Sequence, residues 1–87
     1  MGIEEKLDSL RGVIDGLDDN LLDLLNRRAS ITKEVGDLKR STGQSATFYR
    51  PDREAMVLNR LIEANSGPIM DDDLVRIMRQ IISACLS

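Results

Sequence analysis

Two cations lie inside an apolar stretch of the sequence, at Arg28 and Lys39. On a helix with about 100° per residue, their side chains project about 20° apart, and their backbones lie about 16 Å apart along the axis. Leu21 and Val35 fall within roughly 40° of Arg28. Both cations therefore occupy the stripe that should pack as core, where two long side chains could hold opposite ends of one small anion.

A cation on an apolar stripe more often extends its charge into water or pairs with an internal acid. The balance of charges weakens that interpretation here. Glu54 lies on an inner stripe in line with Leu58, and Arg53 flanks the same face. Three cations against one anion leave a positive pocket, and each unpaired buried charge costs several kcal/mol. We therefore predict an anion-binding pocket around Arg28, Lys39, Arg53 and Glu54.

Three helices are expected to position these residues. Apolar residues recur with a 3.6-residue period from Ile3 to Lys39, and three glycines within this segment leave the phase unchanged. Residues 41–47 lack periodicity and predict a loop. Pro51 is expected to begin a second helix that ends at a Gly-Pro stop signal within residues 65–68. A third helix is expected to begin at Asp71–Asp73, which would supply an N-cap and favourable negative charge. No strand pattern is present, so the expected class is all-α.

The first helix is too long for a compact chain of 87 residues. A helix of about 37 residues is about 55 Å long, whereas a compact globule of this size is roughly 30 Å across. The apolar stripe continues through the overhanging half, so a lone copy would expose Leu and Ile side chains to water. A second copy is the simplest cover. We expect an intertwined homodimer whose second and third helices fold back along the shared long helices.

The composition excludes several classes of function. The chain has two aromatic residues, one Cys and no His, which argues against base stacking, zinc or iron sites, a disulfide scaffold and His-based catalysis. A net charge of -3 argues against nucleic acid or anionic lipid as a partner. No apolar run approaches the roughly 18 residues that span a bilayer, and residues 1–5 show no secretory pattern. We expect a cytoplasmic protein with neither metal nor cofactor.

Other candidate residues lie outside the predicted pocket of their own chain. Arg11 is about 25 Å along the helix from Arg28 and about 100° around it. In an antiparallel dimer it could reach the partner's pocket, although by itself it is typical of a solvated flank. Cys85 falls on the apolar face of the third helix, where a small buried thiol is the simpler interpretation. Five further arginines are expected on the surface: Arg27, Arg40, Arg60, Arg76 and Arg79.

Several separated motifs resemble the all-α chorismate mutase family. Residues 10–39, which include LLDLLNRR and EVGDLK, are similar to its first helix. The motif YRPDREA at residues 49–55 resembles the start of its second helix, and RIMRQII at residues 76–82 resembles its third. The resemblance is closest to the mutase domain that begins many bacterial bifunctional chorismate mutase–prephenate dehydratases. We therefore interpret residues 1–87 as a single chorismate-mutase-like helical domain.

The resemblance implies conversion of chorismate to prephenate, an intramolecular Claisen rearrangement in phenylalanine and tyrosine biosynthesis. Such a step needs a folded substrate and positive donors at the breaking ether oxygen, with no nucleophile, base or metal. By matching position, Lys39 would donate to the ether oxygen and a carboxylate. Arg28 would bind one substrate carboxylate, and Arg11 of the other protomer the second. Glu54 would accept from the substrate hydroxyl, and Arg53 would maintain the charge and geometry of the pocket.

Three departures from the family pattern affect this prediction. Arg50 stands where the family often has Asp, which is a good N-cap, so we expect either that only its backbone contributes to substrate binding or that the cap differs. Cys85 stands where many members carry Ser, which weakens one hydrogen bond to the substrate. The family also places Gln or Glu about one turn beyond Cys85, whereas this sequence stops at Ser87. We expect a truncated piece of a longer chain, such as one with a fused prephenate dehydratase domain, and reduced or lost activity without the rest.

Two other functions fit the same residues. An isochorismate–pyruvate lyase on this scaffold also binds an enolpyruvyl dicarboxylate through Arg and Lys. A non-catalytic dimerisation or regulatory bundle could keep the pocket without turnover. Prephenate or salicylate as the product would distinguish the two enzymes, and the combination of Arg28, Lys39 and Glu54 favours catalysis over a purely structural role.

Overall fold

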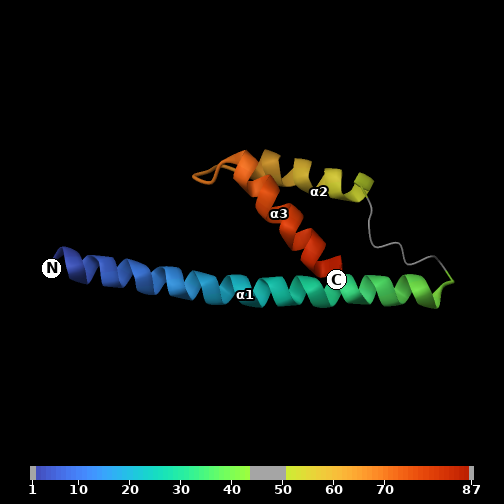
Figure 1. Cartoon of the computed structure of the whole chain (residues 1–87), viewed down its shortest axis with the longest axis horizontal. Coiled ribbons are helices and arrows are strands. Elements are labelled where there is room, and N and C mark those ends of the chain that lie inside the picture. Colours follow the sequence, from blue (N-terminus) through green and yellow to red (C-terminus); the bar gives the residue numbers. More distant parts are fainter. Residues whose placement is uncertain (1, 44–50, 87) are drawn as a thin grey trace.

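The computed structural model describes residues 2–43 and 51–86. These residues form three α-helices and no strand: α1 (Ile3–Ser41), α2 (Pro51–Ala64) and α3 (Asp71–Leu86). The predicted all-α class is therefore confirmed. Figure 1 shows that α2 and α3 form a hairpin, which lies over the C-terminal half of α1.

The helix α1 is continuous over 39 residues, as the unbroken apolar period predicts. It passes through Gly12 and Gly16, where no heavy atom beyond the local helix would contact an added Cβ. Within Ile3–Ser41 the buried residue is Gly36. The acidic first turn and basic last turn of α1 carry the charges that the helix dipole favours.

The turn between α2 and α3 is organised by the side chain of Asn65. Its Oδ1 accepts a hydrogen bond from the backbone N–H of Gly67 at 3.0 Å. Its Nδ2 donates to the carbonyl of Ile69 at 2.9 Å and to Oδ1 of Asp71 at 2.7 Å. Gly67 has φ 79°, a conformation that favours glycine. Asn65 thus links the end of α2 to the start of α3.

The start of α3 differs slightly from the prediction. The backbone N–H of Leu74 donates to the carbonyl of Met70 at 2.9 Å, so Met70 holds the N-cap position. Asp71–Asp73 therefore occupy the first turn of the helix and not the predicted capping position. Their favourable charge at the positive end of the helix dipole is confirmed.

The fold leaves much of α1 uncovered. The chain measures 62 × 24 × 17 Å and has a radius of gyration of 17.4 Å, compared with about 12 Å for a compact chain of this length. The contacts between helices join α3 to α1 and α3 to α2. The buried hydrophobic side chains among the described residues are Val57 and Leu58 of α2, each 7% exposed. The predicted overhang of the first helix is therefore confirmed.

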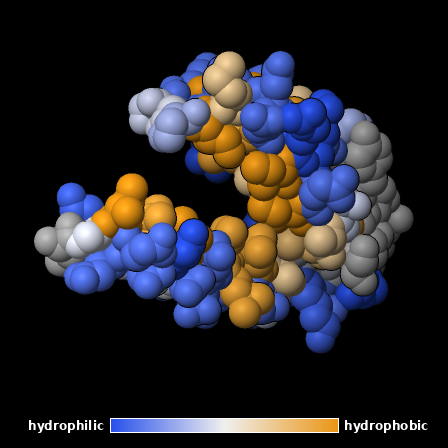
Figure 2. Space-filling model, turned by 60° about the vertical axis from the view of Figure 1, so that its left-hand side comes forward, coloured by the Kyte–Doolittle hydropathy of each residue, from blue (hydrophilic) through white to orange (hydrophobic). Residues whose placement is uncertain are grey.

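The uncovered part of α1 carries an apolar face. Its large side chains Leu10, Ile14, Leu17 and Leu21 are 51–60% exposed, and they lie within about 40° of the direction of Arg28 around the helix. Figure 2 shows apolar side chains gathered on the inner surfaces of an open hollow in the molecule. Within the described segments, no helix combines the length and apolar character needed to span a membrane.

Candidate active site

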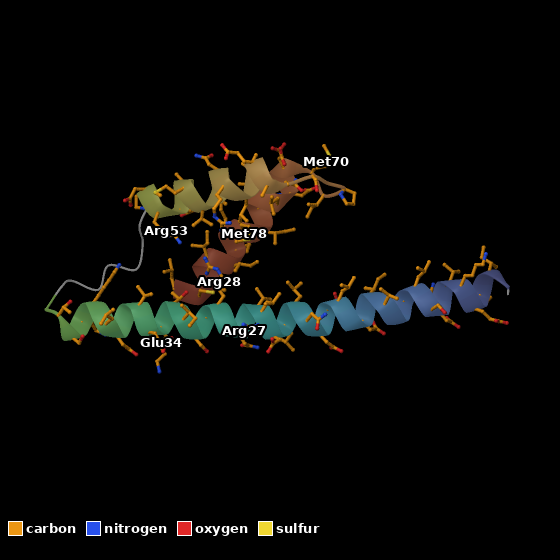
Figure 3. All side chains as sticks on the ribbon, turned by 180° about the vertical axis from the view of Figure 1, so that it is seen from behind. Arg27, Arg28, Glu34, Arg53, Met70 and Met78 are labelled. Carbon is orange, nitrogen blue, oxygen red and sulfur yellow. The ribbon has the colours of Figure 1, made fainter. Side chains whose placement is uncertain are left out.

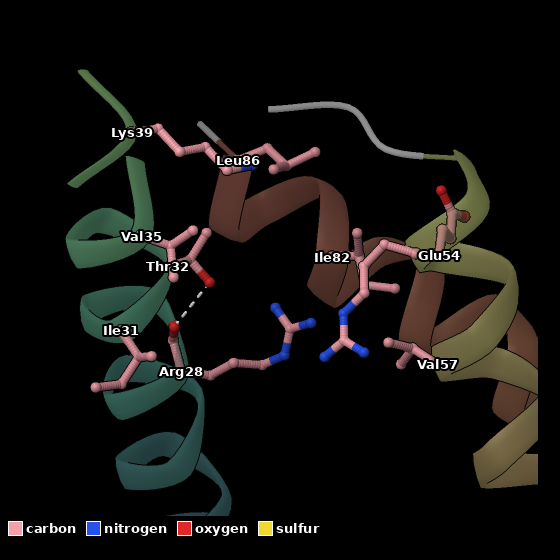
Figure 4. A pocket seen from close by; sticks show the side chains of 10 residues that line it. Arg28, Ile31, Thr32, Val35, Lys39, Glu54, Val57, Ile82 and Leu86 are labelled. Atoms are coloured by element: carbon pink, nitrogen blue, oxygen red, sulfur yellow. Dashed lines mark hydrogen bonds between the residues drawn. The ribbon is translucent and has the colours of Figure 1, made fainter. Parts of the chain in front are cut away.

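A cavity of about 330 Å³ lies between the three helices, within the range typical of small-molecule sites. The residues that line it are Arg28, Ile31, Thr32, Val35 and Lys39 of α1, Arg53, Glu54 and Val57 of α2, and Ile82 and Leu86 of α3 (Figure 4). The structure thus brings together all four side chains of the predicted anion pocket.

The helical repeat of α1 places its two cations along one wall of the cavity. Arg28 and Lys39 are half-buried, and the guanidinium of Arg28 reaches from α1 into the cavity (Figure 4). Between them, the hydroxyl of Thr32 donates to the backbone carbonyl of Arg28 at 2.9 Å. Because this bond uses the hydroxyl proton, Thr32 presents only oxygen lone pairs to other groups. Thr32 therefore donates nothing to a ligand, and the hydrogen-bond donors of this wall are the cations Arg28 and Lys39 at its two ends.

The opposite wall comes from the first turn of α2. The buried Val57 anchors this helix one turn after Arg53 and Glu54. Arg28 and Arg53 belong to facing helices and both lie toward the space between α1 and α2 (Figure 3). Glu54 lies in the first turn of α2, near the positive end of the helix dipole.

The charges in the cavity are unevenly balanced. Among residues 2–43 and 51–86, no acidic group lies within salt-bridge distance of Arg28, Lys39 or Arg53. Glu54 has a side chain that is 21% exposed, and its Oε1 lies 3.6 Å from Nε of Arg79 on α3. The carboxylate of the cavity is therefore paired with a cation outside the lining. Three cations remain for an anionic ligand, beside apolar walls that strengthen their attraction.

The other predicted site residues lie outside this cavity. Arg11 is exposed on the uncovered half of α1, where NH1 lies 3.6 Å from Asp8 Oδ1. Cys85 is half-buried and does not belong to the described cavity lining, although its neighbour Leu86 does. Arg50 lies outside the described residues. A single copy of the chain therefore supplies one end of the predicted site and leaves Arg11 remote from it.

Arg79 is the residue whose environment differs most from the prediction. The sequence predicts five surface arginines that include Arg79, and its side chain is indeed 63% exposed, yet it pairs with Glu54 across two helices. Sequence spacing on one helix gives no signal for such a pair, because the contact depends on how α3 crosses α2. The other arginines conform to the surface prediction: Arg27 pairs with Asp23, Arg40 with Asp37, Arg76 with Asp73, and Arg60 is exposed.

Residues 2–43 and 51–86 contain no group of three or more His, Cys, Asp or Glu side chains placed to hold a metal ion. The chemistry that the cavity offers is that of positioned cations, one carboxylate and apolar contacts.

The same helical arrangement occurs in solved structures of chorismate mutases. The form II structure from Thermus thermophilus superposes with a TM-score of 0.86 at 30% sequence identity, over 93% of this chain and 90% of that one. The form I structure from the same organism gives a TM-score of 0.86 at 29% identity, over 92% and 98%. These matches define the class as all-helical chorismate mutases. The family profile of chorismate mutase type II matches residues 10–87, and the chain belongs to this family.

Curated relatives point in the same direction. The bifunctional chorismate mutase/prephenate dehydratase of Stutzerimonas stutzeri is 40% identical over 90 residues, which cover 100% of this chain and 25% of the relative. The enzyme of the same name from Neisseria gonorrhoeae is 41% identical, over 98% of this chain and 22% of the relative. The T-protein of Enterobacter agglomerans is 39% identical, over 86% of this chain and 21% of the relative. The chain spans about a quarter of the length of these relatives, and the resemblance found in its motifs is confirmed.

Proposed function

We propose that this chain is a chorismate mutase that rearranges chorismate to prephenate. The observation that carries the proposal is the cavity in which Arg28, Lys39 and Arg53 converge without an acidic partner among the described residues. A dicarboxylate of small size supplies the missing negative charge. Membership of the chorismate mutase type II family identifies the class of that dicarboxylate.

The reaction matches what these residues can do. In the substrate, one ether C–O bond breaks while one C–C bond forms in the same molecule, so no atom, proton or electron is exchanged with the protein. A millionfold acceleration corresponds to roughly 8 kcal/mol. Holding the substrate in its folded shape supplies part of this, and charge-assisted hydrogen bonds to the oxygen that gains negative charge supply the rest.

Each residue then has a separate role. Lys39 donates to the breaking ether oxygen and to a carboxylate, so its contact strengthens in the transition state. Arg28 binds a substrate carboxylate from the same wall. Glu54 accepts the hydrogen bond of the substrate hydroxyl, while Arg53 keeps the facing wall positive.

The second carboxylate is bound by Arg11 of another protomer. Along α1, Arg11 lies about 25 Å from Arg28, too far for the two to share one ligand in a single chain. Two antiparallel α1 helices whose midpoint falls near residues 19 and 20 bring Arg11 of one level with Arg28 of the other. The exposed apolar face of Leu10, Ile14, Leu17 and Leu21 surrounds this midpoint. The same pairing thus covers the apolar face and completes the site, and we propose the homodimer on these grounds.

A longer natural chain is part of the proposal. The Stutzerimonas and Neisseria relatives are named as bifunctional enzymes with prephenate dehydratase activity, and this chain corresponds to about a quarter of their length. A dehydratase would consume prephenate directly after its formation. Reading the coding sequence beyond Ser87 tests this point, because the proposal requires a second domain in frame. Such biosynthetic enzymes also support the predicted cytoplasmic location.

The activity is tested by incubating the 87-residue chain with chorismate and identifying the product by nuclear magnetic resonance. We expect loss of chorismate and formation of prephenate. A parallel incubation with isochorismate gives salicylate only if the chain is a lyase. A second protein extended by about ten residues, or three helical turns, measures how much the continuation of α3 adds. Absence of turnover in both proteins would contradict the proposal.

A further inference from the structure

The carboxylate of the cavity and its pairing partner belong to different helices. Glu54 of α2 lines the cavity together with Arg28, Lys39 and Arg53. Its ion pair is nevertheless with Arg79 of α3, at 3.6 Å between Oε1 and Nε. The Arg79 side chain is 63% exposed and approaches from outside the cavity lining. The crossing of α3 over α2 thus brings Arg79, which lies outside the lining, to Glu54, which lies within it.

The ion pair between Glu54 and Arg79 limits a competing interaction between Glu54 and the cations of the cavity. A flexible carboxylate among three cations is drawn toward one of them, and that contact would occupy a donor intended for the substrate. An external cation holds the carboxylate away from the other three. The cost is small, because Arg79 is largely in water and loses little hydration on pairing.

We propose that Arg79 is a positioning residue, which acts on the substrate only through Glu54. It fixes the carboxylate of Glu54 in the orientation that receives the substrate hydroxyl, and it leaves Arg28 and Lys39 available for the substrate. The inference rests on the proposed function, because it assigns a second role to a residue of that same site.

The proposal predicts a specific pattern in steady-state kinetics. Arg79→Gln removes the cation and retains much of the side-chain length. We expect KM for chorismate to rise about fivefold, because the loss of one partly solvated ion pair has an effect of this size. The value of kcat should change by less than about twofold. Hydroxyl binding is present in both the ground state and the transition state, so its loss raises KM and leaves kcat. Arg79→Lys restores a cation and should recover most of the affinity.

A double-mutant cycle separates this role from a structural one. In a Glu54→Gln background the carboxylate is gone, so Arg79→Gln should have no further effect on KM. Arg76→Gln is the matched control, because Arg76 lies on the same helix and pairs with Asp73 away from the cavity. It should leave both constants unchanged. Circular dichroism establishes that each variant retains its helices.

The outcomes distinguish the inference from the function on which it rests. Equal effects of Arg79→Gln with and without Glu54, or failure of Arg79→Lys to recover affinity, would overturn the positioning role while leaving the mutase activity intact. A wild-type chain that binds chorismate without converting it contradicts the proposed function, and calorimetric affinities then complete the same cycle. A wild-type chain that neither binds nor converts chorismate overturns both.

Discussion

Lys39 lies about three helical turns beyond Arg28 on α1, and the two side chains line the same cavity. This spacing separates the donors by about 16 Å along the helix axis at the backbone. Their long side chains can therefore contact different groups of one substrate. A shorter spacing would bring two positive charges against the same carboxylate.

The first prediction concerns Lys39. Lys39→Ala should lower kcat about 100- to 1,000-fold, the usual cost of removing one donor to a developing negative charge. Chorismate consumption measured at saturating substrate gives this number. Lys33→Ala is the matched control, since Lys33 is exposed and lies about 140° around α1 from Arg28. Near-normal turnover by Lys39→Ala would reject the assigned role.

The second prediction tests the shared site. Arg11→Ala and Arg28→Ala should each abolish most activity when pure, because every site in either dimer lacks one carboxylate-binding residue. Mixing the two after unfolding and refolding gives hybrid dimers in which one site is intact. Half of the dimers are then hybrids with one of two sites active, so about a quarter of wild-type activity should return. A mixture as inactive as its components would show that Arg11 does not act across an interface.

The third prediction concerns the apolar face of α1. Leu17→Asp places a charge at the centre of the surface proposed to bind a second copy, and burying an unpaired charge costs several kcal/mol. Light scattering after size exclusion should give the mass of a single chain for this variant and twice that mass for the wild type. Asn26→Asp adds the same charge about 160° around the helix from Arg28 and should remain dimeric. A monomeric wild type would contradict the dimer.

The fourth prediction concerns the hairpin turn. Asn65→Ala removes three hydrogen bonds that link the end of α2 to the start of α3. We expect the free energy of unfolding, measured with urea, to fall by about 1–2 kcal/mol. Asn59→Ala is the comparison, because Asn59 lies on an exposed face of α2 and alanine is the better helix former. Equal stability of the two variants would show that the turn contributes little.

Local signals in the sequence predicted the helices well. The period of apolar residues located α1 from Ile3 to within two residues of its end, and Pro51 marked the first residue of α2. The aspartate run indicated the start of α3, one position away from the actual cap. These features depend on neighbouring residues, so one chain segment contains the necessary information.

The cavity was predictable to the extent that it follows from positions around each helix. Arg28 and Lys39 share a face of α1 and Glu54 an inner face of α2, and the structure brings them together. The pairing of Glu54 with Arg79 was not predictable, because it depends on the crossing of two helices. The roles of Arg11 and Cys85 and the dimer itself stay predictions.

The uncovered half of α1 has a consequence for the stability of the native state. In the proposed dimer, the apolar surface that one protomer exposes to water is buried only on association. The free energy of unfolding therefore depends on protein concentration. Tenfold dilution would lower the urea midpoint of the wild type. Dilution below the dissociation constant of the dimer would also lower the turnover per chain, because Arg11 would leave the site of its neighbour. In that range of concentration, the amount of this protein would set its specific activity.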